Sequence, residues 1–210
     1  MGVSWKSTGG GLVAIIPAVT PHRVNQDQKY ITGHQGQVCD LRFSPFQAGL
    51  LATSSDDATV RIWQIEKDGL TQNLNAETQK YSGHSKRVLF SSWSPTVYEL
   101  IASASFDCSV HVWNILNGAK VWDFSQSENV LSLDWNSLGS LVGCTTKDKL
   151  VHVLDPRSKD SGSRLSVQAH DGIKTHKMVF LSNEHIATTG FSKTNERQIR
   201  LWDTRNFTKE

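Results

Sequence analysis

A glycine followed by a histidine occurs twice at a spacing of fifty positions, as Gly33-His34 and Gly83-His84. Each pair is followed by the same order of short apolar runs, and each series ends on a tryptophan, Trp63 in the first copy and Trp113 in the second. A repeat of about 40–50 residues that contains several short β-type runs indicates one small sheet per repeat. We therefore expect a series of sheets that stack on one another.

Two further copies follow in a more degenerate form. The third spans residues 130–155 and has Leu154 where the earlier copies have tryptophan, and the fourth ends on Trp202-Asp203. The runs are rich in Val, Ile, Leu, Thr and Trp and are separated by turn-forming residues, as antiparallel strands require. Ahead of the first Gly-His pair, residues 12–16 and 29–32 are expected to form the last two strands of a preceding repeat. Residues 68–78 are expected to form a long hairpin loop.

These features resemble WD40 repeats, in which each unit is a four-stranded blade of a β-propeller. In that family a hydrogen-bonded set of His, Ser or Thr, Asp and Trp fixes the turns of each blade. Two candidate sets are complete in this sequence: His34, Ser55, Asp57 and Trp63, and His84, Ser105, Asp107 and Trp113. The third copy lacks the histidine, and the fourth has Glu196 where the aspartate belongs.

Ser, His and Asp together also permit a nucleophile hypothesis. The same arrangement recurs at the same place in two repeats, which favours a structural role, and the sequence contains no G-x-S-x-G elbow. We therefore expect no enzyme activity.

Composition and motifs point away from several other classes of function. The formal net charge of +2 does not favour nucleic acid as a partner, and no apolar run is long enough to insert in a membrane. The three cysteines are far apart and the histidines lack ligand spacing, so neither a disulfide framework nor a metal site is expected. The three glycines at residues 9–11 lack the lysine of a phosphate loop, so no nucleotide or other cofactor is expected.

Basic residues in two loops are the candidate contacts for a partner protein. They are Lys86 and Arg87, directly after the second Gly-His pair, and Arg157 and Lys159, in a later turn. Exposed loops on a rigid scaffold commonly carry binding function.

Several segments resemble the coronins, a WD40-propeller family that binds actin filaments. The similarity covers nearly the whole chain and is most specific in residues 144–149, 155–157, 168–170 and 188–198, where Glu196 is typical of the family. Residues 43–46 and 202–207 are closer to the long coronins, which carry two propellers in tandem. The resemblance implies a seven-bladed propeller, actin-filament binding, organisation of the actin cytoskeleton and a cytoplasmic location, with Golgi association for the long members. The alternative is a propeller adaptor in Golgi-linked vesicle trafficking or ubiquitin-ligase assembly.

The expected fold is thus all-β, a WD40 β-propeller with about four of the seven blades, an incomplete ring. We expect the end of one blade in residues 1–32, full blades in 33–82, 83–125 and 126–168, and an incomplete blade in 169–210. The sequence begins without the basic segment that opens coronin propellers, which weakens the case for strong actin binding. We hypothesise a truncated product, or a ring that a second copy completes.

Overall fold

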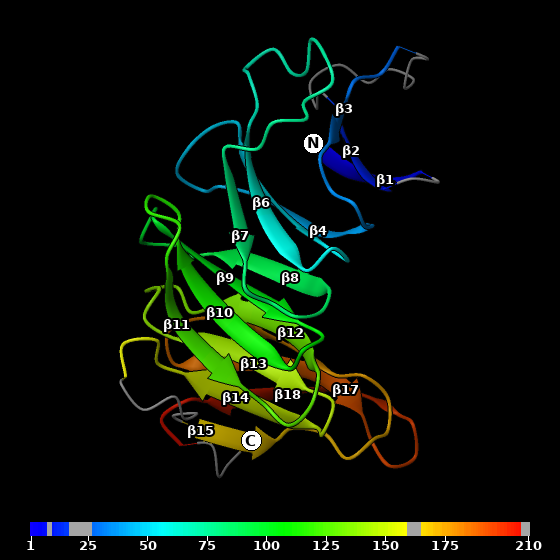
Figure 1. The fold of residues 1–210 in the computed structure, drawn as a ribbon. Coiled ribbons are helices and arrows are strands. Elements are labelled where there is room, and N and C mark those ends of the chain that lie inside the picture. The colour runs from blue at the N-terminus through cyan, green and yellow to red at the C-terminus, as the bar shows by residue number, and fades with distance from the viewer. Residues whose placement is uncertain (8–9, 17–26, 159–164, 207–210) are drawn as a thin grey trace. The chain divides into compact units, whose positions relative to one another are not determined.

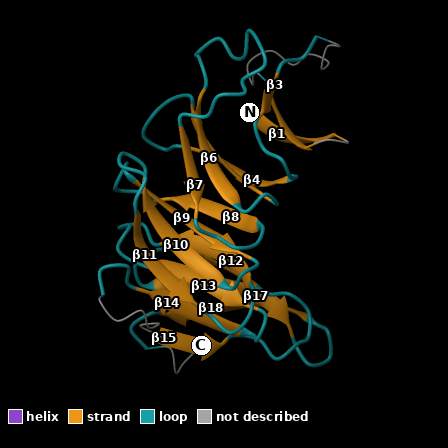
Figure 2. Cartoon of the chain, in the orientation of Figure 1, coloured by secondary structure: helices purple, strands orange, loops and turns teal. Residues whose placement is uncertain are grey.

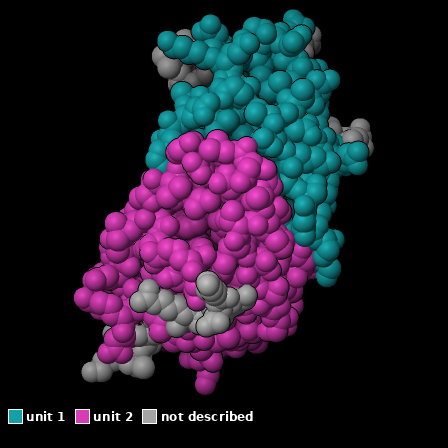
Figure 3. Space-filling model, turned by 60° about the vertical axis from the view of Figure 1, so that its left-hand side comes forward, with its two compact units in different colours: residues 1–91 teal, residues 92–210 magenta. Residues whose placement is uncertain are grey.

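The computed structural model describes residues 1–7, 10–16, 27–158 and 165–206 of the chain. Its described residues form eighteen β-strands and no helix, in agreement with the all-β expectation (Figure 2). Within this part of the chain there is accordingly no helix long and apolar enough to cross a membrane. The chain divides into two compact units, Met1–Ser91 (unit 1) and Ser92–Glu210 (unit 2), which are coloured separately in Figure 3.

Unit 1 contains two antiparallel sheets. The first has the order β1-β2-β3, with strands Gly2–Ser7, Gly10–Ile15 and Tyr30–Thr32. The second has the order β4-β5-β6-β7, with strands Val38–Phe43, Leu50–Ser55, Thr59–Gln64 and Gln79–Ser82. The residues between β6 and β7 include the long loop expected at 68–78, and its Leu74 forms an isolated bridge with Ile31 of β3.

Strand β1 is a correction to the sequence interpretation, which expected two strands ahead of the first Gly-His pair. Its residues alternate between small or polar side chains and Val3 or Trp5, so the local pattern is weak. In the structure β1 pairs with β2 along its whole length, from Gly2 opposite Ile15 to Ser7 opposite Gly10. We attribute the extended conformation of β1 to its pairing with β2 and not to its own residue pattern.

Unit 2 contains the remaining sheets (Figure 1). One sheet has the order β11-β10-β9-β8, with β8 at Val88–Trp93, β9 at Leu100–Ser105, β10 at Ser109–Asn114 and β11 at Lys120–Ser125; the boundary between the units falls within β8. The next has the order β12-β13-β14-β15, with strands Val130–Trp135, Val142–Thr146, Leu150–Leu154 and Leu165–Gln168. The last has the order β16-β17-β18, with strands Lys177–Phe180, His185–Phe191 and Arg197–Asp203.

The second and third strands of the four-stranded sheets are buried on both faces, as in β5, where all six residues are buried. Continuous burial explains why strands such as β5 and β9 are apolar or small throughout instead of alternating with charged residues. In unit 1, Val13 and Ile31 of the first sheet pack with Leu51 and Trp63 of the second. The core of unit 1 therefore lies between its two sheets.

The hairpin between the second and third strands has the same conformation in four sheets. One residue of each turn has a positive φ angle: Ala58 (64°), Cys108 (66°), Lys149 (73°) and Asn195 (63°). In each case its backbone N–H donates to the carbonyl three residues earlier, at 3.0–3.3 Å. None of the four is glycine, so these turns hold left-handed residues at a steric cost.

Candidate functional site

A buried polar set lies in unit 1, where the first Gly-His pair meets strands β5 and β6. His34 Nδ1 lies 2.9 Å from a carboxylate oxygen of Asp57, and its Nε2 lies 2.7 Å from Thr53 Oγ1. The indole N–H of Trp63 donates to the same hydroxyl at 2.8 Å. Because the carboxylate requires a proton on Nδ1, Nε2 is left to accept the Thr53 hydroxyl proton.

Asp57 anchors several groups in addition to His34. Its carboxylate accepts the backbone N–H of Gln35 at 3.0 Å and that of Thr59 at 3.1 Å. The buried guanidinium of Arg61 lies 3.6 Å from the carboxylate of Asp57 and 3.2 Å from that of Glu77. Burial alone would raise the pKa of Asp57, but hydrogen bonds from His34 and Thr59 outweigh it and hold the pKa well below its ordinary range.

Ser55, which the sequence analysis placed in this set, does not supply the bridging hydroxyl. Thr53 does, two residues earlier on the same face of β5. Ser55 is the last residue of β5, and its Oγ donates to Gly36 O at 3.1 Å and accepts the Asp57 N–H at 3.3 Å. Its hydroxyl therefore closes the turn. Trp63 is paired with Leu51, so its indole reaches Thr53, two residues further along β5, but not Ser55 at the end of the strand.

The second predicted set shows the same difference. The indole N–H of Trp113 donates to Ser103 Oγ at 2.8 Å, whereas Ser105 Oγ accepts the backbone N–H of Asp107 at 3.1 Å. Ser103 therefore takes the place that the sequence analysis gave to Ser105. The fourth member, His84, is buried and belongs to unit 1, whereas the other residues belong to unit 2.

The last sheet keeps part of the arrangement without an aspartate. Thr188 Oγ1 accepts the indole N–H of Trp202 at 2.8 Å and lies 3.0 Å from His170 Nε2. Glu196 instead belongs to the turn, where its N–H donates to Ser192 Oγ and its carbonyl accepts the Ser192 N–H. A threonine or serine that receives the tryptophan N–H is thus the shared element of three sheets, and sequence spacing alone did not identify it.

These hydrogen-bonded sets have the geometry of structural elements that hold neighbouring strands together. The Thr53 hydroxyl is fully buried and is held by both His34 and Trp63, and Ser103 and Thr188 are equally buried. Such a hydroxyl lacks a path to a substrate.

Among the described residues, no group of His, Cys, Asp and Glu could hold a metal ion, and the three cysteines are free thiols. Burial raises the pKa of Cys144 to about 12, which disfavours its reactive thiolate.

The candidate contact residues lie on two loops. Lys86 and Arg87 are exposed between β7 and β8. Arg157 follows β14 and is exposed, with its guanidinium held by Asp155 at 2.9 and 3.0 Å. Lys159 lies outside the described residues. Asp203 and Arg205 form the same fork after β18, a repeat that the sequence analysis missed although both pairs have the spacing Asp-x-Arg.

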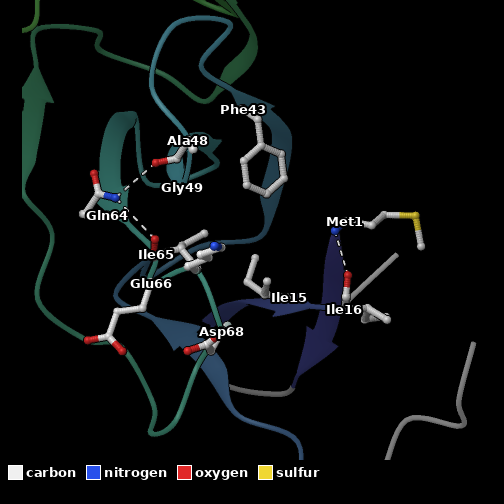
Figure 4. A pocket seen from close by; sticks show the side chains of 12 residues that line it. Met1, Ile15, Ile16, Phe43, Ala48, Gly49, Gln64, Ile65, Glu66 and Asp68 are labelled. Carbon is white, nitrogen blue, oxygen red and sulfur yellow. Dashed lines mark hydrogen bonds between the residues drawn. The ribbon is translucent and has the colours of Figure 1, made fainter. Parts of the chain in front are cut away.

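Unit 1 also contains an open pocket of about 670 Å³ (Figure 4). Met1, Ile15, Phe43 and other apolar side chains line it, and Glu66 and Asp68 lie at one side. The pocket lies between the end of β2, the loop that precedes β5 and the loop that follows β6. It was not predicted, because its residues are brought together only by the packing of two sheets.

Comparisons with known proteins agree with this architecture. A model of the WD domain, G-beta repeat, matches residues 25–64, and a model of the anaphase-promoting complex subunit 4 WD40 domain matches residues 91–189. A chain in a crystal structure of the mitotic checkpoint complex is similar in fold, with a TM-score of 0.75 at 18% identity, over 99% of this chain and 59% of that chain. The protein is a WD40-repeat protein of the β-propeller type, as the repeats predicted.

More specific similarity is to coronins. Coronin-A of Dictyostelium discoideum is 44% identical over 208 residues, which are 99% of this chain and 46% of the relative. Coronin-2A of Bos taurus is 34% identical over 93% of this chain and 38% of its own length. The crystal structure of the WD40 domain of Toxoplasma gondii coronin has a TM-score of 0.93 at 35% identity and covers 98% of this chain and 54% of that chain. The chain belongs to the coronin family and spans about half the length of the relatives it matches.

Proposed function

We propose that this chain is a non-enzymatic scaffold that binds actin filaments and takes part in organising the actin cytoskeleton in the cytoplasm. The observation that carries the proposal is the 44% identity to Coronin-A over 99% of the chain. The family resemblance implies the partner. The buried hydroxyl, imidazole and indole groups support the scaffold role, because they stabilise turns rather than face a substrate.

The loop that contains Lys86 and Arg87 is our candidate for filament contact. Both side chains are exposed, and the loop is anchored on either side by buried residues, His84 and Val88. A basic loop suits a negatively charged protein surface, because opposite charges attract. Its fixed ends reduce the conformational entropy that is lost on binding. Arg157 is a second candidate, although its fork with Asp155 already neutralises part of its charge.

Co-sedimentation with actin filaments at low and moderate salt tests the proposal. The unmodified chain should pellet with filaments, and the double variant K86E/R87E should pellet less, with an unchanged melting temperature. The matched control is K67E/K80E, which reverses two exposed lysines of the same unit outside this loop. Pelleting of the unmodified chain no better than an unrelated protein would overturn actin binding, whereas equal loss in both double variants would overturn only the assignment of the loop.

The comparisons with known proteins offer no support for Golgi association. Affinity capture from cell extract separates the adaptor alternative from the actin scaffold. Recovery of actin would support our proposal, and recovery of coat or ligase subunits without actin would favour the adaptor.

A further inference from the structure

The loop between β15 and β16 carries the most exposed large hydrophobic side chain of the described residues. Ile173 is 95% exposed, and its neighbours Lys174 and Thr175 are exposed as well. Isoleucine is among the residue types most often buried, yet this side chain lies outside the hydrophobic core between the last two sheets. The loop therefore presents an apolar side chain at the surface of unit 2.

The exposure of Ile173 belongs to its place in the repeat. Ile173 is the third residue after the loop histidine, a position that Gln37 occupies in the first copy and Arg87 in the second. Gln37 and Arg87 are exposed although further sheets follow both of them in the chain. We therefore attribute the exposure of Ile173 to the loop itself and not to the outer face of the last sheet.

Hydrogen bonds fix the loop directly ahead of Ile173. The carbonyl of Asp171 accepts a hydrogen bond from Lys149 Nζ at 2.8 Å, and the N–H of Gly172 donates to the carbonyl of Phe191 at 2.8 Å. A Cβ at Gly172 would lie 2.5 Å from that same carbonyl oxygen, so the two backbones are in close contact. The turn between β13 and β14 and the end of β17 thus both hold this side of the loop.

The loop is also fixed after Ile173. The side chain of His176 is buried, and its carbonyl accepts the hydroxyl of Thr145 at 3.3 Å. Between these two ends, Lys174 Nζ lies 4.8 Å from the centre of the Phe191 ring, in a cation–π contact. Because the backbone on both sides of Ile173 is held, little conformational entropy is lost when a partner binds there.

The segments that meet at this loop are basic on balance. They are residues 147–149, 171–177 and 191–197, which together carry six basic and three acidic side chains. A positive balance of charge attracts an acidic surface, whereas the side chain of Ile173 gains free energy only where it leaves water for an apolar pocket. The partner that fits is therefore an acidic protein surface with an apolar depression.

We propose that Ile173 is an apolar anchor through which this chain binds the actin filament, in addition to the loop that contains Lys86 and Arg87. The inference rests on the proposed function, which supplies the partner. The repeat supports this occupant, because Ile173 and the pair Lys86 and Arg87 lie on loops that occupy the same place, directly after a buried histidine. One loop offers charge to the filament and the other offers an aliphatic side chain.

Co-sedimentation with actin filaments tests the proposal with a matched pair of variants. Ile173→Ser removes the apolar side chain without a change of charge, and we expect it to raise the Kd by about tenfold. The melting temperature should stay the same, because Ile173 lies outside the core. The control is Leu116→Ser, since Leu116 is 57% exposed in the loop between β10 and β11 of the same unit. Its Kd should equal that of the unmodified chain.

Salt separates an apolar anchor from a charged contact. Burial of an uncharged side chain is not screened by ions, so the ratio of the Kd of Ile173→Ser to that of the unmodified chain should be the same at low and moderate salt. The effect of K86E/R87E should instead become smaller as the salt concentration rises. A ratio for Ile173→Ser that falls toward one with salt would contradict the role of an apolar anchor.

The remaining outcomes distinguish this proposal from the proposed function. Equal filament binding by the unmodified chain and by Ile173→Ser would overturn the anchor and leave actin binding in place, as would equal losses in Ile173→Ser and Leu116→Ser. An unmodified chain that does not pellet with filaments would overturn both. Vesicles of phosphatidylcholine and phosphatidylserine test a membrane as the partner, and a loss of vesicle binding without a loss of filament binding in Ile173→Ser would show the proposal to be wrong.

Discussion

Thr53 Oγ1 accepts the indole N–H of Trp63 at 2.8 Å, and the same contact recurs between Ser103 and Trp113 and between Thr188 and Trp202 at the same length. In unit 1 the hydroxyl also contacts His34 at 2.7 Å, so one buried oxygen joins two rings. The contact thus ties the third strand of a sheet to the second, and in unit 1 it also ties both to the loop that enters the sheet.

Replacing Thr53 by valine tests the energetic weight of this oxygen. The two side chains have the same shape, but valine leaves the Trp63 N–H and His34 Nε2 without the buried partner that the threonine hydroxyl provides. We expect the free energy of unfolding to fall by about 2–4 kcal/mol. Ser55→Ala should cost only about 1 kcal/mol, because Ser55 closes a turn. Urea titration measures both, and an equal or larger loss in Ser55→Ala would contradict our assignment.

The left-handed turn residues offer a stabilising substitution. Ala58 has a φ angle of 64°, a conformation that glycine adopts without the Cβ clash. We expect Ala58→Gly to raise the free energy of unfolding by about 0.5–1 kcal/mol. Ala48→Gly is the control, since Ala48 is an exposed loop residue without a positive φ, and it should be neutral or destabilising. Thermal and urea unfolding should agree in sign, and a loss of stability in Ala58→Gly would refute the explanation.

Two buried histidines of unit 2 predict a loss of stability in mild acid. Burial lowers the pKa of His152 and His176 below the ordinary value of about 6.5. The unfolded chain then binds more protons than the folded chain, so stability is complete above about pH 6.5 and declines as the pH falls through that value toward the folded pKa. His176→Gln should flatten the decline in urea midpoint between about pH 7.5 and pH 5.5. The exposed His185→Gln should leave the decline in place, and a flat profile in the wild type would exclude this account.

The carboxylate of Asp57 predicts a second loss of folding stability, at lower pH. Its pKa is held below the ordinary range in the folded chain, so its contribution is present above about pH 4 and disappears as the pH falls further. Asp57→Asn should remove this part of the acid dependence and lower stability at neutral pH. Unfolding midpoints measured from about pH 5 to pH 2 would show it, and parallel curves for the two proteins would argue against the carboxylate.

Gly190 tests the packing around the last polar set. A Cβ at this position would lie 2.4 Å from the His170 ring, which is itself held against Thr188. We expect Gly190→Ala to lower the free energy of unfolding by about 1–3 kcal/mol. Gly143→Ala is the comparison, because its Cβ would first meet the flexible end of Met178. Denaturant titration should show a smaller loss of stability in Gly143→Ala than in Gly190→Ala. The reverse order would contradict the rigid position of His170.

Much of this protein was determined by the sequence itself. The recurrence of Gly33-His34 at Gly83-His84 and the tryptophans that end each copy define the WD40 class, because a repeated local pattern needs no knowledge of distant contacts. The family-specific runs identified the coronins in the same way. The histidine, aspartate and tryptophan of the first set could likewise be identified from the sequence, since each occupies a fixed place in the repeat.

Only the tertiary structure decided which hydroxyl completes the set. Thr53 and Ser55 lie on the same face of one strand and both precede Asp57 closely, so spacing cannot separate them, whereas the direction of the Trp63 ring can. Strand β1 likewise depends on pairing with β2, and the pocket beside Met1 depends on two sheets that meet. Val151 of β14 is buried because the β16–β18 sheet packs on it, and such a contact between two sheets cannot be read from the residues of the strand itself.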